Sequence, residues 1–251
     1  MRLLINGDDF GLTKGVSEAI IKCLKDGIMG DTSAMANMPF FEDAIKLAFD
    51  SGIYEMGIHL NFTCGKPVSE VSEVNSICDE NGNFYRRPDL IPKDINIIEA
   101  EKEIRAQIDK FKKTGMKINH IDSHHHFYGF NKEIFNLVVD IADELKVPMR
   151  CPFNEDKHIL KEKRVVCPDY FDNSFYLNNI SLEYLKERLY YLKDKYNTVE
   201  FMAHPSNNGK ELNNISSYNM IREKELEILT SENMKDYISK NNIKVISFSD
   251  L

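Results

Sequence analysis

Four of the chain's seven histidines lie within the seven residues HIDSHHH, at positions 120 to 126, together with one aspartate. Imidazole and carboxylate groups bind divalent metals, and both can carry protons in hydrolytic reactions. The alternative is a polar loop with histidines by chance, or the nonspecific metal affinity of any histidine-rich tract. Other groups that the fold brings to this stretch must decide between these interpretations.

Short apolar runs rich in branched residues alternate with helical patterns along the chain, which is typical of an α/β fold with a parallel sheet. Strands are expected at 2–6, 32–38, 55–62, 117–122, 147–151, 198–203 and 243–248. Two stretches, 63–96 and 152–180, look irregular, and the first is long enough to be a functional loop or lid. The pattern predicts one α/β domain over residues 1–251, barrel-like or open, with about seven parallel strands.

Polar side chains gather where the predicted strands end, and active sites in parallel α/β proteins form at the carboxyl ends of strands. The residues at these ends are Asp8 and Asp9, His59 and Asn61, Asp122, His124 and His126, Arg150, and His204. An aspartate from one strand and histidines from two others would supply three ligands and leave a position for water, as in a catalytic metal site.

Each of these residues also has a plainer interpretation. Adjacent acids in the Gly-flanked GDDFG are often solvated or cap a helix, and His59, inside an apolar run, resembles a hydrogen-bonded core histidine. His204 either caps its loop or transfers protons near neutral pH. Arg150 either orients Asp8, binds substrate or forms a buried structural ion pair. Their shared position at strand ends favours the metal site.

Within HIDSHHH, an extended backbone would alternate its side chains, so Asp122, His124 and His126 would share one direction. His125 would then point away from the site. His120 lies deeper in the strand, where packing is expected.

Composition limits the partners. The 40 acidic and 32 basic residues give a net charge of −8, which disfavours nucleic acid. No run approaches the roughly 18 apolar residues of a membrane helix, and the sequence opens on strand-like MRLLIN, so we expect a cytoplasmic protein without a membrane partner. The five cysteines are scattered and contain no C-x-x-C pair, so neither a disulfide framework nor a thiolate zinc site is expected.

Five ordered motifs, NGDDFGLTKGV, GIHLNFTCGKPV, HIDSHHH, PMRCP and EFMAHPS, resemble the YdjC-like carbohydrate deacetylases, the group that includes chitooligosaccharide deacetylase. The resemblance runs from the first strand to the closing ISFSDL. It implies a distorted (β/α) barrel, similar to a TIM barrel, that removes N-acetyl groups from amino sugars in oligosaccharides. It also implies one divalent metal ion, usually magnesium, although one carboxylate and two imidazoles suit zinc or another transition metal equally well.

The resemblance assigns roles by position. Asp9, His59 and His124 would hold the metal, which would activate water and polarise the acetyl carbonyl. Asp8 would be the general base, by similarity to the more distant NodB-type deacetylases, and His204 the general acid. Asn61, His126, Tyr128 and Arg150 are the expected substrate-binding or supporting residues. Tyr128 stands where the family usually has a third alternating histidine, and Gly7 where it usually has alanine.

Two rival functions use the same scaffold. One is another metal-dependent hydrolysis, of a phosphoester or a cyclic amide; phosphoesterases often need two metals and a phosphate-binding loop. The other is a non-catalytic sugar-binding or metal-storing protein, which would need neither Asp8 nor His204. The substrate would be an N-acetylated oligosaccharide in the leading hypothesis, and the assembly is open between a monomer and a homodimer.

Overall fold

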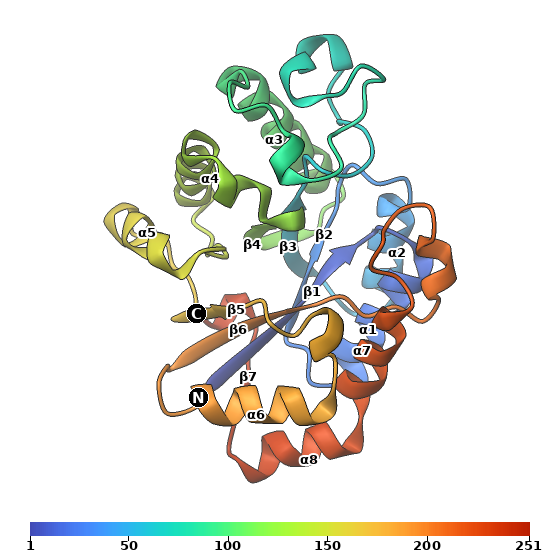
Figure 1. Ribbon diagram of the computed structural model, residues 1–251, viewed down its shortest axis with the longest axis vertical. Helices are drawn as coiled ribbons and strands as arrows, with labels where there is room; N and C mark the ends of the chain where they lie inside the picture. The colour runs from blue at the N-terminus through green and yellow to red at the C-terminus, as the bar shows by residue number, and fades with distance from the viewer.

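A computed structural model describes residues 1–251, and its centre is a seven-stranded parallel sheet (Figure 1). Six strands follow the order β4-β3-β2-β1-β6-β5, and β7 pairs with the start of β1. The strands are β1 (Arg2–Phe10), β2 (Asp31–Ala34), β3 (Glu55–Leu60), β4 (Lys117–Ser123), β5 (Tyr170–Asp172), β6 (Thr198–Ala203) and β7 (Lys244–Val245). The first strand is therefore the centre of the sheet and is paired along both edges.

Eight helices surround the sheet (Figure 1). They are α1 (Lys14–Asp26), α2 (Phe41–Asp50), α3 (Ile97–Lys112), α4 (Lys132–Leu145), α5 (Lys157–Lys163), α6 (Leu182–Leu192), α7 (Ile221–Thr230) and α8 (Glu232–Lys240). The first is typical: Thr13 caps it by accepting from the Val16 amide, and Val16, Ile20 and Cys23 are buried against the sheet. None of the helices combines the length and apolar character needed to span a bilayer.

The sheet curves into a distorted barrel whose last gap, between β4 and β5, is closed by irregular chain. Here Met149 forms a single parallel bridge with Ile121, and its amide donates to the Val166 carbonyl. The predicted strand 147–151 is therefore wrong as a strand. Pro148 has no N–H to donate to a ladder, and only one bridge forms.

The segment 152–180, predicted to be irregular, contains the missed elements α5 and β5. Strand β5 has only three residues, too few for an alternating pattern to be detectable. The predicted closing strand 243–248 is shorter than expected: after β7 the chain turns into a 3-10 helix, η8 (Phe248–Asp250), beneath the sheet.

The long connection from Leu60 to α3, which includes the region 63–96 expected to be irregular, contains three short 3-10 helices and an antiparallel bridge between Cys78 and Phe84. Buried Glu103 of α3 accepts the amides of Val68 and Ser69, and Glu99 accepts that of Ser76. Carboxylates thus satisfy backbone donors that have no strand partner, which fixes the loop against α3.

Candidate metal centre and active site

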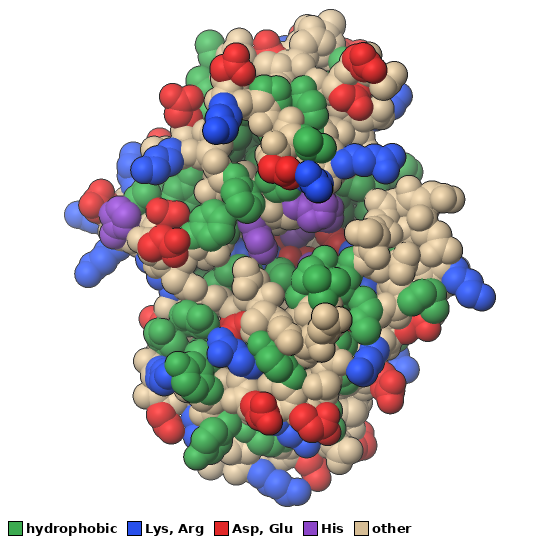
Figure 2. Space-filling model, in the orientation of Figure 1, with side chains coloured by type: hydrophobic (Ala, Val, Ile, Leu, Met, Phe, Trp, Pro, Cys, Tyr) green, Lys and Arg blue, Asp and Glu red, His purple; other side chains and the backbone are tan.

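The carboxyl ends of β1, β3, β4 and β6 lie close together. The polar residues that the sequence predicts at these strand ends therefore lie close together as well. Figure 2 shows histidine and carboxylate side chains at the bottom of a hollow that crosses the middle of this face. Asp8, Asp9 and His59 are at most 2% exposed, so the hollow ends on charged groups that are almost completely withdrawn from water.

The aspartate pair depends on a backbone irregularity. In a regular strand the side chains of Asp8 and Asp9 would point to opposite faces. Instead, Asp9 has a φ of 71°, and the register between β1 and β2 shifts between Gly7 and Phe10. Aspartate tolerates this left-handed conformation better than most residues do. The bulge turns both carboxylates towards the same centre.

Asp9, His59 and His124 form one ligand group. The Oδ1 atom of Asp9 lies 2.8 Å from Nδ1 of His124 and 3.4 Å from Nε2 of His59. One atom from each residue can be chosen so that all lie within 4.8 Å of one another. The structure thus brings together the three residues predicted as metal ligands.

Asp122 orients His59 from behind. Its Oδ1 lies 2.9 Å from Nδ1 of His59, and its Oδ2 accepts the Ser33 hydroxyl at 2.8 Å. With the carboxylate on one ring nitrogen, the other nitrogen faces Asp9, an arrangement that is usual for metal-binding histidines. The sequence places Asp122 at a strand end without indicating its role. The signal for that role is its position two residues before His124, on the same predicted side of the strand.

Arg150 is the cation at the base of the site. It is fully buried, and it donates to both oxygens of Asp8, at 2.6 and 2.8 Å, and to Glu200 at 2.6 Å. Burial alone would raise the pKa of Asp8, but the charge and hydrogen bonds of Arg150 hold it well below its usual range. Burial raises the pKa of Glu200 to about 7 despite Arg150. Of the three roles considered for Arg150, the contacts correspond to orienting Asp8 within a buried ion pair.

Arg222 is a second buried cation, and sequence reasoning missed it. It extends from the first turn of α7, and its Nη2 atom donates to Oδ2 of Asp9 at 2.8 Å. Burial would raise the pKa of Asp9, but His124 and Arg222 hold it well below its usual value. No local pattern distinguishes Arg222 from the exposed charges of the same helix, Glu223 and Lys224.

His204 follows β6 and faces Asp8, with 3.8 Å between its Nε2 and the Asp8 Oδ2. Its backbone amide donates to Glu225 of α7 at 2.6 Å, which fixes the start of the loop. Its ring lies beside Tyr176 and Tyr218, and burial lowers its pKa to about 4. The ring is therefore neutral at pH 7, and it is not one of the three candidate metal ligands.

The stretch HIDSHHH does not remain extended, so the predicted alternation after Ser123 is wrong. His124 begins the 3-10 segment η4 (His124–Phe130), and His125 and His126 have φ values of 52° and 54°. His125 does not point away: its ring packs on His124, with centroids 3.9 Å apart, and its Nδ1 lies 3.1 Å from the Thr63 hydroxyl. The rings of His126 and Phe171 pack in a T-shaped arrangement, with their centroids 5.3 Å apart.

The remaining predicted contacts lie behind the hollow. Tyr128 is fully buried, and its hydroxyl donates to the Arg150 carbonyl at 2.8 Å. The Asn61 side chain donates to Asn37 and to the Cys64 carbonyl, where it shapes the start of the insertion. His120 packs as predicted: it is fully buried and stacks on Phe248.

The charge balance of the site fits a divalent cation. The buried carboxyl groups around the centre are those of Asp8, Asp9, Asp122, Glu200 and Glu225, and the buried guanidinium groups are those of Arg150 and Arg222. Negative groups outnumber positive ones. Burial would lower the pKa of His59, yet Asp122 and Asp9 raise it to about 10, so the position between its ring and Asp9 favours a positive charge. A metal ion would supply that charge in place of the proton.

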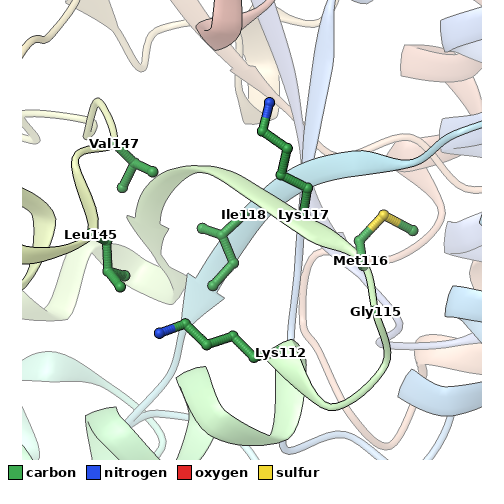
Figure 3. Close-up of a pocket in the computed structure, with 7 residues that line it drawn as sticks. All are labelled: Lys112, Gly115, Met116, Lys117, Ile118, Leu145 and Val147. Atoms are coloured by element: carbon green, nitrogen blue, oxygen red, sulfur yellow. The ribbon is translucent and has the colours of Figure 1, made fainter.

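A second hollow lies where α3 ends and β4 begins (Figure 3). It has a volume of about 250 Å³ and is lined by Lys112, Gly115, Met116, Lys117, Ile118, Leu145 and Val147. It contains no histidine or carboxylate, and it lies at the amino end of its strand. It offers no groups for the chemistry found at the opposite end.

The fold and the site define a parallel α/β barrel with a buried aspartate–histidine centre at its strand ends. The family model described as YdjC-like protein matches residues 2–240, and the chain therefore belongs to the YdjC-like family. A protein named carbohydrate deacetylase from Thermoanaerobacter pseudethanolicus is 36% identical over 99% of this chain and 98% of its own.

Two solved structures extend the comparison. A crystal structure from Enterococcus faecalis V583, whose name assigns it provisionally to cellobiose-phosphate cleavage, superposes with a TM-score of 0.93 at 32% identity, covering 99% of this chain and 98% of its own. A family 4 carbohydrate esterase from Streptomyces lividans superposes with a TM-score of 0.53 at 9% identity, covering 97% and 91%. The second likeness concerns the fold alone.

Proposed function

We propose that this chain is a metal-dependent carbohydrate deacetylase that hydrolyses the N-acetyl group of amino sugars in chitooligosaccharide-type substrates. The observation that carries the proposal is the pair Asp8 and His204, which face each other beside the ligand group and do not belong to it. Binding a metal requires neither residue, whereas amide hydrolysis requires a base and an acid. The deacetylase names of full-length relatives support the same substrate class.

Asp9, His59 and His124 would hold one divalent ion, which, when bound, supplies activation of water and polarisation of the acetyl carbonyl. Magnesium is the expected ion by family resemblance, and the two imidazoles make manganese or zinc an equal fit. Asp8 is kept ionised by Arg150, so it can accept the proton of the attacking water.

His204 would protonate the leaving nitrogen. Because its pKa lies near 4, the ring is neutral before the reaction and must gain a proton during it. Asp8, with Oδ2 at 3.8 Å from the ring, is the nearest group that has just received one. The arrangement therefore couples the proton taken from water to the proton given to the amine.

A rival is cleavage of a phosphorylated disaccharide, since the Enterococcus relative is named for that reaction. Both buried arginines of the site are already paired with aspartates, and the second possible ligand group, Asp8, His59 and Asp122, shares His59 with the first. These contacts favour a single metal, and the charge of each guanidinium at the base of the site is already balanced by an aspartate.

The test measures acetate released from N-acetylated chitooligosaccharides by the full chain, with Mg²⁺, Mn²⁺ or Zn²⁺ and after chelation. We expect metal-restored acetate release, and a loss of roughly a thousandfold in Asp8→Asn. No acetate from any N-acetylated sugar, or full activity in Asp8→Asn, would refute the proposal. Phosphate or sugar phosphate released from phosphorylated disaccharides would favour the rival.

A further inference from the structure

Arg222 joins two elements that are far apart in the sequence. It leaves α7, lies 2% exposed, and is held at both ends: Nε donates to the Tyr218 carbonyl at 2.8 Å, and Nη2 donates to Asp9 of β1 at 2.8 Å. The contact therefore places a guanidinium, which is charged at every physiological pH, directly beside Asp9.

The two oxygens of Asp9 consequently have different environments. Oδ1 faces both imidazoles, with His124 Nδ1 at 2.8 Å and His59 Nε2 at 3.4 Å, whereas Oδ2 faces Arg222. The carboxylate cannot rotate to present both oxygens to the imidazole side without breaking a buried charged hydrogen bond, and such bonds are among the strongest in proteins.

We propose that Arg222 is a positioning residue that reserves Oδ1 of Asp9 as a single metal-binding oxygen and limits the affinity of the site for the ion. The inference rests on the proposed metal site. A carboxylate with one oxygen engaged elsewhere leaves more of the ion's coordination positions for water and substrate. The nearby guanidinium charge also opposes the binding of a divalent cation.

The experiment measures Mn²⁺ binding to the metal-free full chain by calorimetry, without sugar. Arg222→Gln removes the charge and frees Oδ2, so we expect Mn²⁺ to bind about tenfold more tightly. Water-proton relaxation of the Mn²⁺ complex should fall, since a second carboxylate oxygen displaces water from the ion. Arg222→Met is a second uncharged variant with the same expected result, should Arg222→Gln fail to fold.

Two control variants separate this role from simple structural support. Arg222→Lys keeps the charge and should bind Mn²⁺ within about threefold of the wild type. Arg105→Gln removes a charge from a surface pair with Glu101 and Glu144, away from the site, and should leave Mn²⁺ binding unchanged.

Supporting partners of metal ligands usually strengthen binding, and their loss costs about 10- to 100-fold in affinity. Equal or weaker Mn²⁺ binding in folded Arg222→Gln would therefore overturn the inference, as would a wild type that binds no Mn²⁺. A wild type that binds Mn²⁺ but releases no acetate would refute the deacetylase alone, since no sugar enters this measurement.

Discussion

Two buried aspartate–histidine groups lie at different levels of the same sheet. The upper group is Asp9 with His59 and His124. The lower group is Asp31, at the start of β2, with His120 and the closing segment. Asp31 accepts the Thr32 amide on one oxygen, and the Asn119 amide and the Phe248 backbone N–H on the other, each at 2.9 Å. The same residue types thus form the proposed metal site in one place and a structural joint in the other.

The difference is the supply of buried cations. Arg150 holds the pKa of Asp8 well below normal, and His124 together with Arg222 does the same for Asp9, so both stay ionised. The lower group has no arginine: burial raises the pKa of Asp31 to about 7 and lowers that of His120 to about 3. The two groups therefore differ in whether buried cations keep their carboxylates charged, and the group with charged carboxylates lies at the carboxyl ends of the strands.

The largest expected effect is on activity. His59→Gln removes a proposed ligand and should lower kcat/KM for acetate release roughly a thousandfold, since metal stabilisation is worth several kcal/mol. His120→Gln, on the neighbouring strand, should remain within about tenfold of the wild type. Equal losses in the two variants would remove the distinction between the upper and lower groups.

The next effect is on stability. Arg150→Met leaves Asp8 and Glu200 buried without their counter-charge, and breaking a buried pair in this way costs about 3 to 5 kcal/mol of unfolding free energy. Arg105→Met, at a surface pair, should cost less than about 1 kcal/mol. Urea unfolding measures both, and a small loss in Arg150→Met would contradict the role given to the buried cation.

The lower group should respond to pH. The folded pKa of Asp31, about 7, lies above its unfolded value, so its contribution to stability is fully present below about pH 4 and is lost as pH rises through 7. Between pH 4 and pH 8, we expect the unfolding free energy of Asp31→Asn to fall by about 2 to 4 kcal/mol less than that of the wild type. Unfolding free energies at pH 4 and pH 8 test this, and an identical change in the two proteins would contradict it.

The smallest effect is expected at Tyr128. Its hydroxyl donates to the Arg150 carbonyl and does not face the hollow, so Tyr128→Phe should lose about 1 kcal/mol of unfolding free energy. Acetate release should change by no more than about threefold. A large loss of activity with normal stability would show instead that this tyrosine contacts substrate.

The sequence predicted the α/β class, six of the strands and the gathering of polar residues at their ends, because buried parallel strands are apolar. The choice of Asp9, His59 and His124 as the ligand group came from the family resemblance and not from the strand pattern. The strand pattern failed where the backbone departs from regularity. The prediction of which side chains point into the site assumed a regular alternation along each strand. The left-handed residues Asp9, His125 and His126 break that alternation. A three-residue strand such as β5 leaves no period to detect.

The role of Arg222 could not be predicted from the sequence, for a different reason. Its partner Asp9 lies 213 residues away, and a surface helix and a helix with one buried arginine have the same local pattern. Half of the positions of α7 are charged, and only tertiary contact selects one of them. Asp122 was within reach of sequence reasoning, since it shares a strand with a proposed ligand.

The central strand β1 has partners that are synthesised much later than the strand itself. The strand that carries Asp8 and Asp9 is synthesised before β6, with which it pairs, and before Arg150 and Arg222, which pair with its aspartates. Until the chain has grown past residue 222, at least one of these two carboxylates lacks its counter-charge. A nascent chain stopped before α7 would therefore contain both aspartates without the cation that holds Asp9.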